Sequence, residues 1–154
     1  MAAEPTEPAE QGADDLHRAA RTIALLARTL ERAAGDLSLP QYRVLALVAA
    51  GDERATHLAG RLAITKPSVS AVVDGLVERG YLAREPVADD RRAVRLCVTT
   101  AGAAALATAE DAMAERLEPL LSAVDDPDAL FAGLDQIRDE MRARRFERDQ
   151  ARSR

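Results

Sequence analysis

The sequence predicts a mainly α-helical domain with one small β-hairpin, in which a central lobe is flanked by helices on both sides. Apolar residues recur at helical spacing over most of the 154 residues. The spacing changes to strict alternation only near residues 82–98, which is the pattern of a short hairpin. A hydrophobic fraction of 47% with 31% charged residues is typical of a globular protein, and 3% aromatic residues leave an aliphatic core.

The N-terminal part of the chain predicts a tail followed by a helix. Residues 1–12 are expected to form a disordered acidic tail, since they are rich in Ala, Glu and Pro and show no apolar periodicity. A single domain is expected over residues 13–150. Its first helix is predicted to begin after Asp14 or Asp15 and to end before Gly35.

The second helix is predicted from a capping box, because Ser38 and Gln41 have the S-x-x-Q spacing of that motif. Pro40 lies in the first turn of this helix, where a missing N–H costs little. A short third helix is expected over about residues 55–62. It would form a helix-turn-helix with the helix that follows.

The fourth helix is predicted to begin after Thr65, which is a suitable N-cap residue. An apolar stripe along this helix would face the core, formed by Val69, Val72, Val73, Leu76 and Val77. Gly80 can adopt the left-handed conformation that ends a helix, which would place Tyr81 over Leu76.

The hairpin and two further helices complete the chain. Residues 82–85 predict a short strand that ends at Pro86, and residues 94–98 predict a half-buried partner strand. The charged residues between the strands would form the tip. An Ala-rich helix is predicted over residues 100–124, with a bend or break near Glu115 caused by Pro119. A sixth helix is expected to begin at Asp126-Pro127 and to fade after Phe146.

A helix-turn-helix followed directly by a two-stranded wing is typical of a winged-helix DNA-binding protein. The charge distribution agrees, because residues 40–100 carry a net charge of +2 in a chain whose net charge is −5. The start of the fourth helix would then face the major groove. Its candidate DNA-binding residues are Thr65, Lys66, Pro67, Ser68, Ser70 and Ala71.

The chain resembles the MarR-type winged-helix transcriptional regulators over about residues 39–102. The matching residues are Leu58, Ala59, Leu62 and Ile64, then Pro67 to Ser70, Leu76, Gly80 to Leu82 and the wing residues Asp90 to Thr99. The wing fits the family pattern D-x-R-x(5)-L-T, with Val98 in the Leu position. This chain has Ala71 and Gly75 where many members have arginines, so more of the expected contact would come from the wing.

The resemblance implies a homodimer in which the first and last helices, about residues 13–34 and 100–148, intertwine. It also implies that Arg92 enters the minor groove of double-stranded DNA and that Asp90 orients it through a salt bridge. Arg91 and Arg95 are further candidates for wing–DNA contacts, and His57 is a candidate for a phosphate contact. His17 and Tyr42 are candidates for an effector pocket where the first, second and fifth helices meet.

We therefore expect a homodimeric repressor that binds a pseudo-palindromic operator in double-stranded DNA and is released by a small-molecule effector. Two alternatives remain: a redox-sensing regulator that uses the thiol of Cys97, and a winged-helix module that binds protein and not DNA. We expect no enzymatic activity, no cofactor and no metal, because no catalytic or metal-binding motif is present. A cytoplasmic protein that does not bind membranes is expected from the single cysteine, the absence of a signal sequence and the short apolar runs.

Overall fold

The computed structural model describes residues 8–51, 58, 62, 65–87 and 90–152. The elements in these residues are α1 (Pro8–Ala33), α2 (Leu39–Ala49), α4 (Lys66–Glu78), β1 (Leu82–Val87), β2 (Asp90–Val98), α5 (Thr100–Leu121) and α6 (Pro127–Arg152). The mainly helical fold class with one hairpin is confirmed. The short helix expected over residues 55–62 lies outside the described residues, apart from Leu58 and Leu62.

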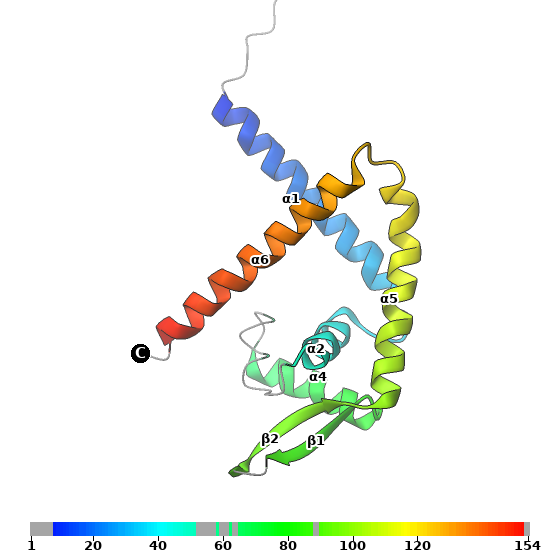
Figure 1. The fold of residues 1–154 in the computed structure, drawn as a ribbon, viewed down its shortest axis with the longest axis vertical. Coiled ribbons are helices and arrows are strands. Elements are labelled where there is room, and N and C mark those ends of the chain that lie inside the picture. The colour runs from blue at the N-terminus through cyan, green and yellow to red at the C-terminus, as the bar shows by residue number, and fades with distance from the viewer. Residues whose placement is uncertain (1–7, 52–57, 59–61, 63–64, 88–89, 153–154) are drawn as a thin grey trace, which may run out of the picture.

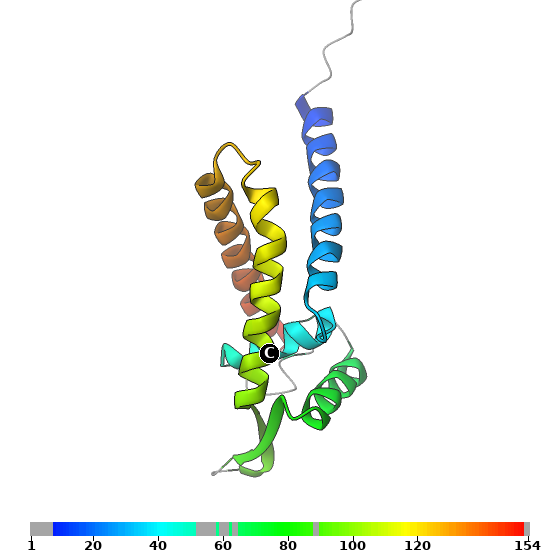
Figure 2. The same ribbon diagram turned by 90° about the vertical axis from the view of Figure 1, so that its right-hand side faces the viewer.

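The helix α4, the hairpin and α2 gather around the N-terminal half of α5 and form what we call the winged lobe (Figure 1). The helix α1 extends away from this lobe, whereas α6 begins near the far end of α5 and runs back to the level of α2 (Figure 1). The helices α1 and α6 cross in the projection of Figure 1, but Figure 2 shows them apart, on either side of α5.

The winged lobe contains the main hydrophobic core. Its buried residues are Leu37, Val44, Leu45, Val48, Leu58, Val69, Val73, Leu76, Leu82, Leu96 and Ala109. The predicted stripe of α4 is confirmed, since Val69, Val73 and Leu76 are buried while Val72 and Val77 pack against the same cluster. No polar or charged residue is buried among the described residues, so apolar packing holds the lobe together.

The predicted start of α2 is also confirmed. The Ser38 hydroxyl accepts a hydrogen bond from the backbone N–H of Gln41 at 3.4 Å, and the Gln41 side chain accepts one from the N–H of Ser38 at 3.0 Å. Both bonds satisfy N–H groups that the helix itself leaves unpaired. Gly35, which follows α1, has a φ of 62° and allows the chain to turn toward α2.

The end of α4 is the predicted Schellman motif. The N–H of Gly80 donates to the carbonyl of Val77 and the N–H of Tyr81 donates to that of Leu76, both at 2.9 Å. Gly80 has a φ of 73°, which a residue with a side chain adopts only at a cost. The chain therefore passes from α4 into β1 without a loop.

The two strands are longer than the sequence predicts. They pair antiparallel with Leu82 opposite Val98 and Pro86 opposite Val94, and the register shifts between Pro86 and Val87. Pairing continues beyond the proline because each strand of a two-stranded sheet has a free edge, where a missing N–H leaves no neighbour unbonded. The charged residues from Asp90 onward, expected in the loop, thus begin β2.

The first turn of α5 is fixed to the end of α4. Thr99 caps α5, and its hydroxyl donates to the Gly80 carbonyl at 2.6 Å while its N–H donates to the Tyr81 carbonyl at 3.1 Å. A Cβ atom on Gly102 would lie 2.1 Å from the Tyr81 oxygen, so only glycine permits this close approach.

Several predicted helix boundaries differ from the structure, among them the end of α6, which reaches Arg152 although the helix was expected to fade after Phe146. The helix α1 begins at Pro8, although residues up to 12 were expected in the tail; Ala, Glu and Gln in this segment are good helix formers. Of the bend or break expected near Glu115, the break is wrong, because α5 continues through Pro119 to Leu121. This proline lies in the last turn, where it removes one hydrogen bond and few helical residues follow it.

Candidate nucleic-acid interface

The candidate residues at the start of α4 lie on the surface of the winged lobe. Lys66, Pro67, Ser68, Ser70 and Ala71 are all exposed. This placement leaves their side chains accessible to a ligand. The expectation that they contact DNA is not tested by it and stays a prediction.

Thr65 and Ser68 are partly occupied by capping the helix. The Thr65 hydroxyl accepts from the N–H of Ser68 at 3.3 Å, and the two hydroxyl oxygens lie 2.8 Å apart. Thr65 thus acts first as the N-cap that positions the start of α4. Lys66 follows Thr65 directly and is the cationic side chain among the candidate residues of α4.

An ion pair that the sequence analysis did not identify links α4 to the hairpin. Asp74, on the exposed side of α4, pairs with Arg84 of β1. An unpaired carboxylate at this position would repel phosphate, and Arg84 offsets that charge. No sequence pattern relates two residues ten positions apart across a helix end, so only the fold reveals the pair.

Arg95, a predicted wing contact, is held by the opposite strand. Its Nε and Nη2 atoms lie 3.1 and 2.7 Å from Glu85 Oε2, as expected for residues in register. The hydrogen bonds from Arg95 and from Cys97, together with the Arg95 charge, lower the pKa of Glu85. Both members of the ion pair are about half exposed, so the pair itself contributes little to stability.

The remaining wing residues are described in part. Asp90, Arg91 and Arg92 form the start of β2, at the end of the hairpin that lies farthest from α5 (Figure 1). Their side chains lie outside the described part of the structure. His57 lies outside it entirely. Cys97, in the middle of β2, is partly buried, which agrees with its interpretation as a small filling residue.

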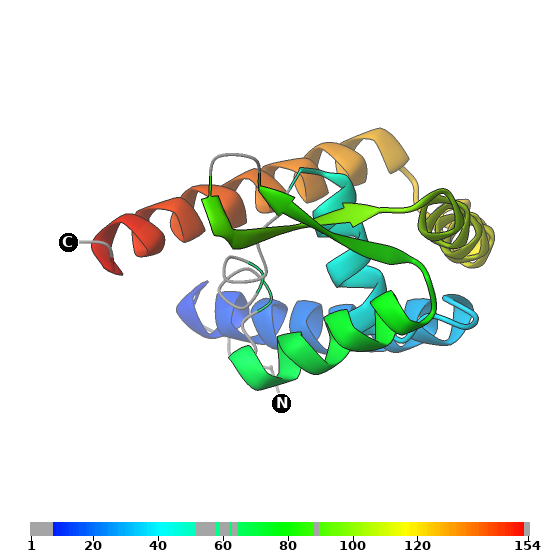
Figure 3. The ribbon, with the colours of Figure 1, turned by 90° about the horizontal axis from the view of Figure 1, so that it is seen from below.

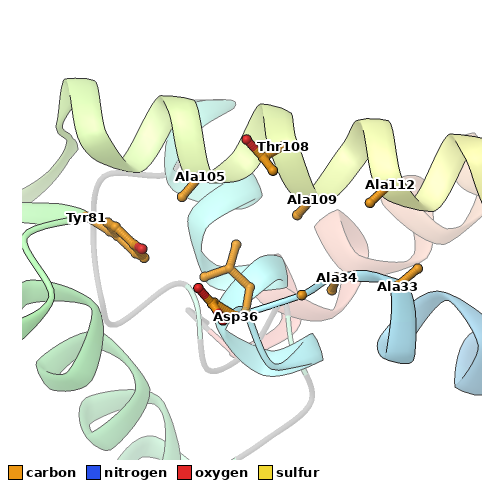
Figure 4. Close-up of a pocket in the computed structure, with 10 residues that line it drawn as sticks. Ala33, Ala34, Asp36, Tyr81, Ala105, Thr108, Ala109 and Ala112 are labelled. Carbon is orange, nitrogen blue, oxygen red and sulfur yellow. The ribbon is translucent and has the colours of Figure 1, made fainter.

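A cavity of about 400 Å³ lies where the end of α1 and the α1–α2 connection face α5. Half of the residues that line it are alanines, and the side chains of Ala105, Ala109 and Ala112 on α5 face the connection that contains Asp36 (Figure 4). Tyr81 forms one end of the cavity. No residue of α2 lines the cavity, so it lies between α1 and α5, and the expected effector pocket at the junction of the first, second and fifth helices stays a prediction.

The two residues predicted for that pocket are not among its lining residues. His17 is exposed on α1, and Tyr42 is half-buried on α2. Burial and the neighbouring Glu110, to which it is hydrogen-bonded, raise the pKa of Tyr42. Sequence reasoning missed the alanines of α5 because small apolar residues on a helix carry no chemical signal of a cavity.

Among the described residues, no group of three or more His, Cys, Asp or Glu side chains is placed to hold a metal ion. None of the helices in the described part of the chain combines the length and the apolar character that a membrane crossing requires.

The sequence model of the MarR family matches residues 35–93. No match is found among curated proteins. Among solved structures, the transcriptional regulator BldR from Sulfolobus solfataricus is 22% identical with a TM-score of 0.71, and the match covers 88% of this chain and 99% of BldR.

Two other solved structures share the fold and contain a bound partner. CouR from Rhodococcus jostii RHA1, bound to p-coumaroyl-CoA, is 21% identical with a TM-score of 0.68, covering 87% of this chain and 94% of CouR. A mutant of MepR from S. aureus, bound to an oligodeoxyribonucleotide, is 19% identical with a TM-score of 0.59, covering 82% of this chain and 97% of MepR.

Proposed function

We propose that this chain, a MarR-type winged-helix protein by its family match and its fold, is a homodimeric transcriptional regulator that binds double-stranded DNA. One observation carries the proposal. The start of α4 and the free end of the hairpin lie on the same side of the winged lobe in both Figure 1 and Figure 3. A helix end and a two-stranded ribbon so placed fit a major groove and the minor groove beside it.

The proposed contacts follow from this placement. Lys66, Ser68 and Ser70 would bind phosphates and base edges in the major groove. Arg92 would enter the minor groove, oriented by Asp90, while Arg91, Arg95 and the partly capping Thr65 would contact the backbone nearby. Pro67, Ala71 and His57 complete the proposed surface, with Ala71 suited to a thymine methyl group.

The proposed dimer is supported by the exposed apolar faces of α1 and α6. Leu134, Ile137 and Met141 lie on one face of α6 and are about half exposed, while Leu16 and Ile23 on α1 are 73% and 61% exposed. Large apolar side chains gathered on two long helices mark an interface rather than a free surface. The occupant that fits both helices at once is a second copy of the chain, and a symmetric dimer would read a pseudo-palindromic operator.

The proposed effector is a small, largely apolar molecule bound in the cavity between α1 and α5. A volume of about 400 Å³ is within the range of ligand sites, and alanine walls offer apolar contact. Another protein with this fold also binds a ligand, since the structure of CouR contains p-coumaroyl-CoA. We propose that occupancy releases the operator, so that the protein acts as a repressor, and that it has no enzymatic activity.

The test of this proposal is the affinity for duplex DNA, measured by fluorescence anisotropy as a function of salt. Binding should weaken steeply as salt rises, because each phosphate contact releases counterions. Arg92→Ala should weaken binding by about tenfold or more. Arg116→Ala, which removes an exposed charge from α5 outside the winged lobe, is the matched control and should leave the affinity unchanged.

Two results would contradict the proposal. A salt slope near zero would end the claim of phosphate contact and favour a module that binds protein. Unchanged affinity in the Arg92→Ala chain would remove the wing from the mechanism.

A further inference from the structure

Arg79, the C-cap residue of α4, joins the end of that helix to a distant part of the chain. Its Nη1 atom donates to the backbone carbonyl of Asp36 at 2.8 Å, across 43 residues of sequence. Its Nη2 atom donates to the Tyr81 hydroxyl at 3.2 Å, and the guanidinium carbon lies 4.6 Å from the centre of the Tyr81 ring. One planar side chain thus connects α4, the start of the hairpin and the α1–α2 connection.

The two residues that Arg79 holds are both walls of the cavity. Asp36 and Tyr81 line it together with alanines of α1 and α5 (Figure 4). A molecule that fills the cavity therefore contacts Asp36 and Tyr81, the hydrogen-bond partners of Arg79, whereas no residue of α4 lines the cavity. The position of these partners decides whether Arg79 keeps its present contacts.

The backbone around Tyr81 is rigid, while the contacts of Arg79 are adjustable. The Tyr81 backbone takes part in the Schellman motif, accepts a hydrogen bond from Thr99 and packs closely on Gly102. Arg79 and Asp36 are exposed. A change in the cavity would therefore alter the guanidinium contacts at lower cost than it would move the backbone of the hairpin.

We propose that Arg79 is a positioning residue that transmits the occupancy of the cavity to the recognition helix α4. This inference rests on the proposed function, because it assigns a route between the proposed effector cavity and the proposed DNA-binding helix. A filled cavity displaces Asp36 or the Tyr81 ring, the guanidinium loses one of its two hydrogen bonds, and the last turn of α4 is released from the α1–α2 connection. The empty and filled states then differ in their affinity for DNA.

The experiment fills the cavity by mutation, so that no effector has to be known. Ala105→Leu adds a larger side chain from the α5 wall, and Ala107→Leu adds the same group at an exposed position of α5 outside the lining residues. Each is made in the parent chain and in an Arg79→Gln chain. Ala112→Val is a smaller filling of the same wall, for use if thermal unfolding shows that the Ala105→Leu chain does not fold.

We expect Ala105→Leu to weaken duplex binding about tenfold when Arg79 is present and less than about twofold when it is Gln, which is the range of allosteric couplings. Ala107→Leu should have no effect in either chain. Arg79→Lys keeps the charge but loses the planar fork, so it should behave as Arg79→Gln. Equal effects of Ala105→Leu in both chains, or an Arg79→Lys chain that behaves as the parent, would overturn the inference.

A second measurement does not depend on DNA. Hydrogen exchange of the backbone amides from Gly75 to Arg79 should be about tenfold faster in the Ala105→Leu and Arg79→Gln chains than in the parent or in Ala107→Leu. Unchanged exchange in the Ala105→Leu chain would overturn the inference even where DNA binding is intact. If no chain binds duplex DNA, the proposed function fails, and the exchange measurement still decides the role of Arg79.

Discussion

The winged lobe and the two terminal helices bury their apolar side chains to very different degrees. Leu45, Leu58 and Leu76 in the lobe are 0% exposed, whereas Ile137 on α6 is 56% exposed and Leu25 on α1 is 69% exposed. Each terminal helix has 26 residues, and none of their described side chains is buried. A single chain thus completes the core of its lobe but leaves the apolar side chains of its two long helices largely uncovered.

Local interactions do not replace that missing packing. The helix α6 carries ion pairs between neighbouring turns, among them Arg144 with Glu140 at 2.6 Å. Exposed pairs of this kind stabilise a helix by only tenths of a kcal/mol, and most helical stability in proteins comes from tertiary contacts. This difference in burial between the lobe and the terminal helices is the observation on which the proposed dimer rests.

The largest effect is expected from charges on the apolar face of α6. A chain with both Leu134→Asp and Ile137→Asp should be monomeric at concentrations where the parent is a dimer, because a symmetric interface would contain four buried carboxylates without partners. Sedimentation velocity measures the mass. Gln136→Asp, on the exposed polar side of the same turn, is the control and should remain dimeric. A double variant that sediments as the parent would place the interface elsewhere.

A core substitution should affect the lobe strongly. Leu76→Ala removes a fully buried side chain and should lower the free energy of unfolding by about 3 kcal/mol, since it leaves a cavity in the core. Leu16→Ala, made at a side chain that is 73% exposed, should cost less than about 0.5 kcal/mol in a monomeric background. Both substitutions are made in the monomeric chain that carries Leu134→Asp and Ile137→Asp. Urea unfolding then compares their free energies of unfolding. A loss below about 1 kcal/mol at Leu76 would contradict the assignment of the core.

Alanine substitutions at two glycines, one in the winged lobe and one in α6, should change the stability of the protein in opposite directions. Gly102→Ala should destabilise the protein by about 2 kcal/mol, because the new Cβ would lie 2.1 Å from the Tyr81 oxygen. The end of α4 and the start of α5 cannot move apart freely, since hydrogen bonds from Thr99 join them. Gly133→Ala, where a Cβ meets nothing within 4 Å in the single chain, should stabilise α6 by up to about 1 kcal/mol in the monomeric background that carries Leu134→Asp and Ile137→Asp. Thermal unfolding measures both, and stabilisation by Gly102→Ala would show that the close approach to Tyr81 does not exist.

The smallest effect is expected from the ionisation of Tyr42. Burial and Glu110 raise its pKa above the ordinary value of 10.0, so the phenol of the folded protein stays neutral where the unfolded chain ionises. The contribution to stability is therefore fully present below pH 10 and is lost as the pH rises through the folded pKa. The chain has two tyrosines and no tryptophan, so ultraviolet titration of a Tyr81→Phe chain reports Tyr42 alone. A midpoint at or below 10 would contradict the prediction.

Much of the winged lobe was predictable from the sequence because its signals are local. The capping box of Ser38, the N-cap of Thr65 and the helix end at Gly80 each involve residues within a few positions of one another, and the structure confirms all three. The resemblance to MarR-type regulators is confirmed by the family match over residues 35–93. The extent of the hairpin and the continuity of α5 were not predicted correctly, because strand pairing and the position of Pro119 within its helix outweigh the local signals.

The candidate site was predictable to a smaller degree. The sequence placed the start of α4 and the wing on the surface, whereas a pocket at the junction of three helices was expected only from the family resemblance and stays a prediction. It did not find the lining alanines or Arg84 and Arg79, whose partners lie 10 and 43 residues away. Contacts over such separations depend on how the helices pack, and periodicity carries no information about them.

By itself, the sequence determined the order of the elements, the apolar face of each lobe helix and the residues that begin and end them, because propensity, capping and hydrophobic periodicity act over one or two turns of chain. Only the tertiary structure decided which charges meet across elements, where a cavity opens and which apolar faces remain uncovered. Those features arise when segments far apart in the chain pack together, and their energies depend on distance in space and not on separation in sequence.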